Sequence, residues 1–133
     1  MSEVVSTISQ LISAHKKHKK YATADKQDIS HHLLLFYSLE CALKAYYLKS
    51  NKLLNTSQLK ENFGLSKKFG HSHNLMEWLK ELKLPNSGYT DNPATPIVQM
   101  HERLRYGVFG NSTYEKEQIK FLIDTLSTLK EKI

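Results

Sequence analysis

Apolar residues recur every three or four positions through most of the chain, which is the spacing of amphipathic helices. The first such stretch contains Val4, Val5, Ile8, Leu11 and Ile12. It runs into a basic cluster, so we expect a helix that ends near Lys20, where cations suit the helix dipole. The next stretch, YATADKQD, has the composition of a loop.

The second segment, from about Ile29 to Leu48, is almost wholly apolar and is interrupted by Glu40 and Lys44. At helical spacing one stripe of this segment consists of Leu33, Tyr37, Glu40, Lys44 and Tyr47. Apolar residues also cover the far side. Because a helix that is apolar all round is surrounded by protein, we expect it at the centre of the bundle, or between the bundle and a second subunit.

The middle of the chain is more polar. Thr56 or Ser57 is placed to cap a short helix through Phe63, and Ser72 is placed to cap another that ends before Pro85. The proline-containing stretch 86–96 is expected to be an exposed loop.

Two further helices are predicted after this loop. Pro96 fits the first position of a helix that is capped by Thr95 and stops near Gly107. Ser112 and Glu115 form a capping box for a long C-terminal helix. The apolar face of that helix is predicted to contain Ile119, Leu122, Ile123, Leu126, Leu129 and Ile133. The whole pattern predicts one all-α domain over residues 1–133, an antiparallel bundle of four to five helices.

Composition agrees with a soluble globular protein, since 40% of the 133 residues are apolar and 24% are charged. Cys41 is the only cysteine, and the N-terminus carries no secretory pattern, so we expect a reducing, cytoplasmic location. The apolar run 33–48 is shorter than the roughly 20 residues of a membrane span and contains two ionisable side chains. We therefore expect no membrane association.

Basic residues outnumber acidic ones by 19 to 13, which gives a net charge of +6. The densest run is His15, Lys16, Lys17, His18, Lys19 and Lys20. A basic surplus favours polyanions, so this run is a candidate nucleic-acid patch. The alternative is a solvated helix end without a ligand.

Two pairs of polar residues are candidate ligand contacts. Glu40 and Lys44, four apart on one helical face, form either a pair that fixes register or a subunit contact, or a pair in a functional cleft. His71 and His73 flank a helix cap and are candidate ligands or packing residues. Metal sites need three or four ligands, and no CxxC or HExxH motif is present, so we predict no metal.

His101 and Arg105, in MHERLRYG, are also four apart and are expected to project together beside a groove. A guanidinium there would hold phosphate or carboxylate, or it would pair with a carboxylate or face a partner protein. Arg103 points elsewhere on the helix. The chain contains no nucleophile elbow, phosphate-binding glycine loop or carboxylate pair, which argues against ordinary hydrolase, kinase and dinucleotide-binding activities. No cofactor is predicted.

The motifs LLLFYSLECALKAYYLKSN, GHSHNLMEWLKELKL and HERLRYG together resemble the HEPN superfamily, in particular its small stand-alone bacterial members. The resemblance covers roughly Ile29 to Tyr106. It implies a bundle of four or five helices that forms a symmetric homodimer with a cleft near the dimer axis. Many members are metal-independent endoribonucleases of toxin, abortive-infection or CRISPR systems, and others are non-catalytic binders of nucleotides or RNA. The late RY motif makes Arg103, Arg105 and Tyr106 candidate ligand contacts.

The sequence departs from the ribonuclease motif of that family, an arginine and a polar residue followed by a histidine four to six residues after the arginine. Tyr106 follows Arg105, and Asn111 stands where the histidine would be allowed. Asparagine forms hydrogen bonds but does not titrate, so no general base is evident. We therefore expect a homodimer that binds RNA or a nucleotide, without strong catalysis, in a defence or toxin–antitoxin setting with an antitoxin or a defence-system protein as partner. The alternatives are a ribonuclease that uses His101 and Arg105, and a protein-interaction module.

Overall fold

The computed structural model describes residues 6–22, 29–58, 75–85, 88–110 and 112–133. Within these ranges the chain forms α1 (Ile8–Ala22), α2 (Ile29–Ser50), the 3-10 helix η1 (Thr56–Gln58), α4 (Leu75–Leu82), the 3-10 helix η3 (Ile97–Gln99), α5 (Met100–Arg105) and α6 (Thr113–Lys130). These five α-helices confirm the predicted all-α bundle. No helix in the described part of the chain is long and apolar enough to cross a membrane.

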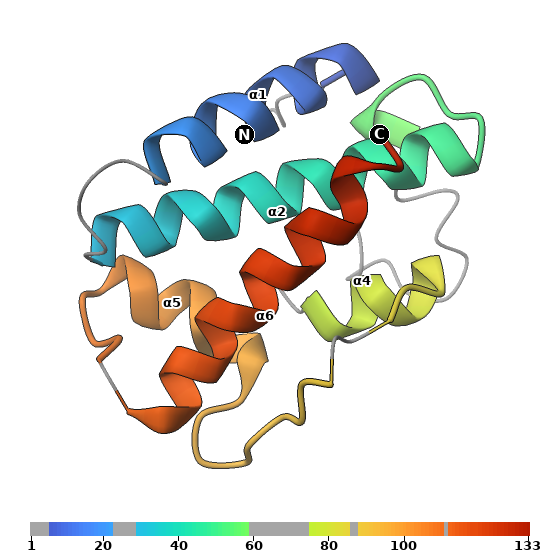
Figure 1. Cartoon of the computed structure of the whole chain (residues 1–133). Helices are drawn as coiled ribbons and strands as arrows, with labels where there is room; N and C mark the ends of the chain where they lie inside the picture. Colours follow the sequence, from blue (N-terminus) through green and yellow to red (C-terminus); the bar gives the residue numbers. More distant parts are fainter. Residues whose placement is uncertain (1–5, 23–28, 59–74, 86–87, 111) are drawn as a thin grey trace.

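Helix α2 passes through the middle of the molecule, with α1 antiparallel along one side, α6 crossing its front, and α4 and α5 below it (Figure 1). Its buried residues are Leu35, Phe36, Ser38, Leu39, Glu40, Ala42, Leu43, Ala45, Tyr47 and Leu48. They lie on all sides of the helix, as the sequence pattern predicts.

The stripe on α2 that contains Glu40 and Lys44 contacts α5 near its start and α4 at its end. Near its start the ring of Tyr37 lies 5.6 Å from His101 of α5, and at its end Tyr47 lies 6.0 Å from Trp78 of α4. Glu40 is 7% exposed and Lys44 is half-buried. The two charges are therefore enclosed to different degrees within one face of the central helix.

The segment after α2 is tied back to the start of α1. Ser6 and Thr56 exchange two hydrogen bonds of 2.9 Å, one to the Thr56 hydroxyl and one from the Thr56 N–H to the Ser6 carbonyl. Asn55 Oδ1 accepts a bond from the N–H of Ser57, so Asn55 caps this turn instead of the predicted Thr56 or Ser57. Residues 59–74 lie outside the described part.

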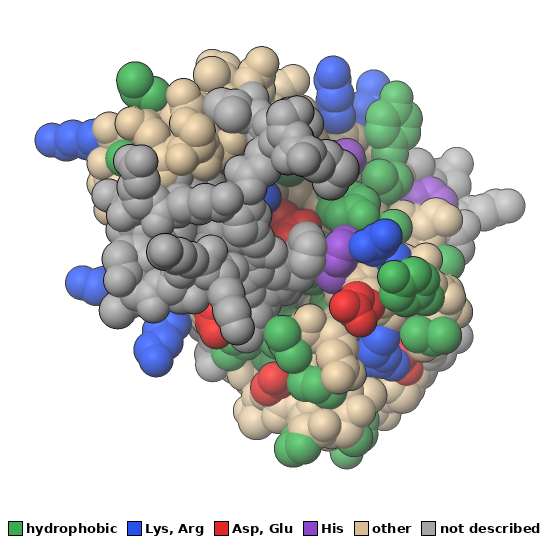
Figure 2. Space-filling view, turned by 180° about the vertical axis from the view of Figure 1, so that it is seen from behind, with side chains coloured by type: hydrophobic (Ala, Val, Ile, Leu, Met, Phe, Trp, Pro, Cys, Tyr) green, Lys and Arg blue, Asp and Glu red, His purple; other side chains and the backbone are tan. Residues whose placement is uncertain are grey.

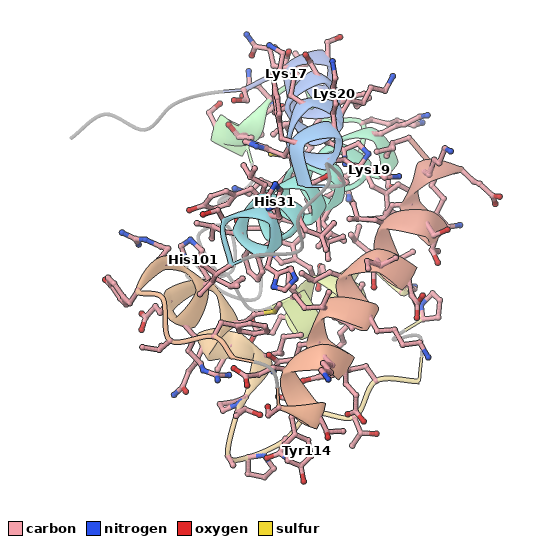
Figure 3. The ribbon with its side chains drawn as sticks, turned by 60° about the vertical axis from the view of Figure 1, so that its left-hand side comes forward. Lys17, Lys19, Lys20, His31, His101 and Tyr114 are labelled. Carbon is pink, nitrogen blue, oxygen red and sulfur yellow. The ribbon has the colours of Figure 1, made fainter. Side chains whose placement is uncertain are left out.

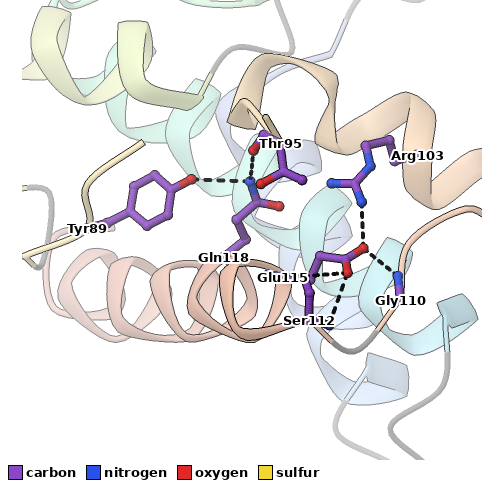
Figure 4. A network of polar contacts seen from close by, with 7 residues as sticks. All are labelled: Tyr89, Thr95, Arg103, Gly110, Ser112, Glu115 and Gln118. Carbon is purple, nitrogen blue, oxygen red and sulfur yellow. Dashed lines mark hydrogen bonds and ion pairs between the residues drawn. The ribbon is translucent and has the colours of Figure 1, made fainter. Parts of the chain in front are cut away.

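Stretch 86–96 was predicted to be exposed, but Tyr89 in it is buried against Phe121 with ring centroids 5.0 Å apart. Its hydroxyl donates to Asp91 Oδ1 at 2.9 Å. The same hydroxyl accepts from Gln118 Nε2 at 3.2 Å, and Gln118 also donates to the Thr95 carbonyl (Figure 4). Burial raises the pKa of Tyr89 to about 12. A buried aromatic side chain thus fixes a stretch with loop composition onto α6.

The predicted Thr95 cap is wrong. Asp91 Oδ1, held by the Tyr89 hydroxyl, accepts the hydrogen bond from the N–H of Ile97, while the Thr95 hydroxyl makes no hydrogen bond. A carboxylate six residues upstream therefore caps the element, which starts as a 3-10 helix and becomes α-helical at Met100.

Helix α6 begins with the predicted capping box, in which Ser112 and Glu115 bond each other's backbone. The predicted apolar face of α6 is wrong at one position, because Ile123 is 50% exposed. The face toward the core is formed by Gln118, Phe121, Leu122, Thr125, Leu126 and Leu129. At 100° per residue Ile123 falls beyond the edge of this face.

Candidate nucleic-acid interface

Three helix ends meet at one end of the molecule: the C-terminal end of α1, the N-terminal end of α2 and the C-terminal end of α5 (Figure 1). This follows from the antiparallel packing of α1 on α2 and from the packing of α5 beside Phe36 and Tyr37. Most of the described candidate residues lie at this end.

His15 does not belong to the exposed basic cluster, since it is only 4% exposed. Its Nδ1 lies 2.9 Å from Ser38 Oγ, and that hydroxyl donates to the His15 carbonyl at 2.9 Å. Because the hydroxyl proton is used there, Nδ1 is the donor toward Ser38. Burial lowers the pKa of His15, and the charges of Lys19 and Lys16 lower it further. The prediction of His15 as a surface contact is therefore wrong: it is a core residue.

The lysines of the cluster remain at the surface. His15 and His18 are three apart and face α2, so Lys16 and Lys17 point away from it; both are exposed, as is Lys20, while Lys19 is half-buried. Figure 3 shows Lys17, Lys19 and Lys20 around the end of α1. The predicted cationic patch is thus formed by its lysines.

Tyr37 joins α1 to α5. The ring of His18 lies 5.8 Å from the Tyr37 ring, and the Nε2 of His101 lies 3.3 Å from the Tyr37 hydroxyl. His101 also stacks on Phe36 at 5.5 Å and is 5% exposed. This aromatic contact fixes the end of α1 relative to α5.

His101 and Arg105 do not project together as predicted. His101 is enclosed by α2, whereas Arg105 is exposed, with its guanidinium 5.5 Å from the ring centroid of Tyr106. Tyr106 is 68% exposed. One turn of helix separates the two candidates, and the packing of α5 on α2 assigns one to the core and the other to the surface.

Arg103 is paired inside the protein. Its Nη2 donates to Glu115 Oε2 at 2.6 Å (Figure 4). Its guanidinium lies 5.4 Å from the centroid of the Phe109 ring. Glu115 also accepts bonds from the Gly110 N–H and from the N–H and hydroxyl of Ser112. Arg103 therefore has a structural partner that the sequence did not reveal.

The pKa of Glu115 reflects opposing effects. Burial raises it, but the bonds from Gly110 and Ser112 and the charge of Arg103 together lower it below the ordinary glutamate value. Glu115 is thus ionised near neutral pH, and its carboxylate accepts hydrogen bonds from four donors.

Other candidates are spread through the molecule. Glu40 is buried in the middle of α2, while Arg105 is exposed on α5. His71, His73 and Asn111 lie outside the described residues. Within the described ranges, no three His, Cys, Asp or Glu side chains gather as a metal site requires.

A cavity of about 340 Å³ lies between residues 88–90 and α6, away from the helix ends. Glu117 and Asp124 line it together with Lys120. Two carboxylates and one ammonium make this cavity a poor match for a polyanion.

The chain matches no protein-family model, no curated protein and no solved structure. The HEPN resemblance therefore stays a prediction that rests on the sequence motifs.

Proposed function

We propose that the protein binds RNA or a nucleotide through what we call the basic end, formed by Lys16, Lys17, Lys20, Arg105 and Tyr106. The observation that carries the proposal is the presence of exposed cations on both α1 and α5 at one end of the bundle. Seen from behind, lysine and arginine side chains lie above and below histidine and hydrophobic side chains on this face, with an acidic side chain next to the lower ones (Figure 2). Phosphate contacts of this kind supply most of the non-specific affinity for nucleic acids.

The packing beneath the basic end supports this proposal. Because Tyr37 contacts both His18 and His101, the ends of α1 and α5 that carry the cations are held relative to each other. Preorganised contacts bind more tightly because less conformational freedom is lost on binding.

The same packing favours binding over catalysis. A general base has to reach the proton that it abstracts. His101 is 5% exposed, and its Nε2 already contacts the Tyr37 hydroxyl. The proposed homodimer therefore binds its ligand without cleaving it. Ribonuclease activity is the alternative, and incubation of the protein with RNA tests it.

Fluorescence anisotropy with a labelled RNA tests the binding proposal. Wild-type affinity is expected to fall steeply between about 50 and about 200 mM salt. Replacing two phosphate contacts in Lys16→Gln/Lys17→Gln should weaken binding and reduce the salt slope by about 2. The control Lys80→Gln/Lys130→Gln removes the same charge from exposed positions on α4 and α6. Absence of binding at low salt, or equal loss in the control, would contradict the proposal.

Incubation of the protein with RNA in the presence of a chelator separates binding from catalysis. We expect the RNA to stay intact. Cleavage that disappears in His101→Ala, while the far-UV circular dichroism of the variant matches that of the wild type, would instead identify a ribonuclease.

A further inference from the structure

We infer that Tyr106, together with Arg105, is a stacking platform for an unpaired base, so that the preferred ligand is a single-stranded RNA. This inference rests on the proposed function and adds the class of nucleic acid. It concerns the part of the basic end contributed by α5.

The exposure of Tyr106 is the first observation. Its side chain is 68% exposed, and the guanidinium of Arg105 lies 5.5 Å from its ring centroid. Bases stack on tyrosine rings and on arginine planes in complexes with single-stranded RNA. The pair therefore offers an aromatic ring and a phosphate-binding cation side by side.

The backbone around Tyr106 is held in place. The N–H of Val108 donates to the Arg103 carbonyl at 2.9 Å and that of Gly107 to the Leu104 carbonyl at 3.4 Å. With Gly107 at φ +71°, these bonds form a Schellman motif that ends α5 after Arg105, with Tyr106 as the C-cap residue. The ring is thus displayed from a fixed helix terminus.

A second anchor follows within a few residues. Glu115 of α6 binds both Arg103, in the last turn of α5, and the N–H of Gly110. The segment that carries Tyr106 is therefore fastened on both sides. A backbone that is already ordered loses little conformational entropy when a base stacks on the ring that it carries.

The separation of the two cation groups argues for an oligonucleotide. The lysines lie on α1 and Tyr106 at the end of α5, with α2 packed between the two helices. Two helix-packing distances of 8–10 Å place the axes of α1 and α5 up to about 16–20 Å apart, and the exposed lysines point away from α2, which lengthens the span between the two groups. A strand of several nucleotides spans this distance, whereas one nucleotide contacts one group only. Bases paired within a duplex do not offer their faces to the ring.

Substitution of Tyr106 separates stacking from charge. Tyr106→Leu should weaken binding of a labelled oligouridine by roughly 5- to 150-fold, the equivalent of 1–3 kcal/mol for one stacked base. The salt slope should stay unchanged because no cation is lost. Tyr106→Phe keeps the ring and should bind as the wild type does.

Tyr114→Leu is the matched control. Tyr114 is 49% exposed but lies at the far end of the molecule from Lys17 (Figure 3). Its substitution should leave the affinity unchanged. Far-UV circular dichroism of each variant confirms that the helices are intact.

An abasic oligonucleotide and an RNA duplex of equal length complete the experiment. Both should bind wild-type protein more weakly than oligouridine does, and Tyr106→Leu should remove the difference for the abasic strand. If the wild type binds oligouridine but Tyr106→Leu binds equally well, or if the duplex binds as tightly, the platform is wrong while the proposed function stands. If the wild type binds no RNA at low salt, the proposed function itself fails.

Discussion

Glu115 shows how one side chain connects two helices. Its carboxylate closes the capping box of α6 and at the same time binds Arg103 of α5 and the backbone of Gly110. The sequence predicts the capping box because Ser112 and Glu115 are three residues apart. It does not predict the contact with Arg103, because that contact depends on how α5 and α6 are placed relative to each other.

We expect Glu115→Gln to lower the free energy of unfolding by about 2–4 kcal/mol, because an amide leaves buried donors and Arg103 without a charged acceptor. Urea unfolding followed by fluorescence of Trp78, the only tryptophan and 1% exposed, measures this loss. Glu117→Gln, at an exposed position of the same helix, should change stability by less than about 0.5 kcal/mol. Equal effects of the two substitutions would contradict the role of Glu115.

The same residue predicts a pH dependence. The pKa of Glu115 is lower in the folded protein than in the unfolded chain, so ionised Glu115 favours folding. This contribution is complete above the unfolded pKa of about 4.3 and is lost as the pH falls through the folded pKa. Wild-type stability should therefore decrease more than that of Glu115→Gln in this acidic range.

At the scale of elements, the end of α5 depends on a left-handed glycine. Gly107 has φ +71°, and a Cβ at this position would meet no atom within 4 Å. A side chain there would therefore cost conformational strain without a steric clash. The sequence predicts that the helix stops near Gly107, and the structure confirms it with α5 ending at Arg105.

We expect Gly107→Val to destabilise the protein by about 1–2 kcal/mol, since branched residues resist the left-handed conformation. Gly107→Asn should cost less, because asparagine tolerates this conformation. The midpoints of urea unfolding of the two variants decide the matter. If asparagine is as costly as valine, strain at this φ is not the cause.

At the scale of the whole molecule, the HEPN resemblance predicts a homodimer. Each chain has a mass of 15.4 kDa. Size-exclusion chromatography with light scattering should give about twice that mass over a range of protein concentrations. A monomer mass at every concentration would contradict the homodimer, while the basic end would remain available within a single chain.

The sequence by itself determined the helices and most of their ends. The centre of the bundle was predictable because α2 is apolar on every side, and the start of α6 because a capping box is local. Such features depend on residues three or four positions apart, which a sequence displays directly.

Only the tertiary structure decided which polar candidates reach solvent. His15 and His101 are enclosed by α2, Arg103 is bound to Glu115, and Arg105 stays exposed. Histidine and arginine suit either a core contact or a surface, so helical spacing alone did not distinguish between these roles. Contacts between helices far apart in sequence determine which of these side chains are buried. The lysines of the basic end remain exposed, as do Arg105 and Tyr106.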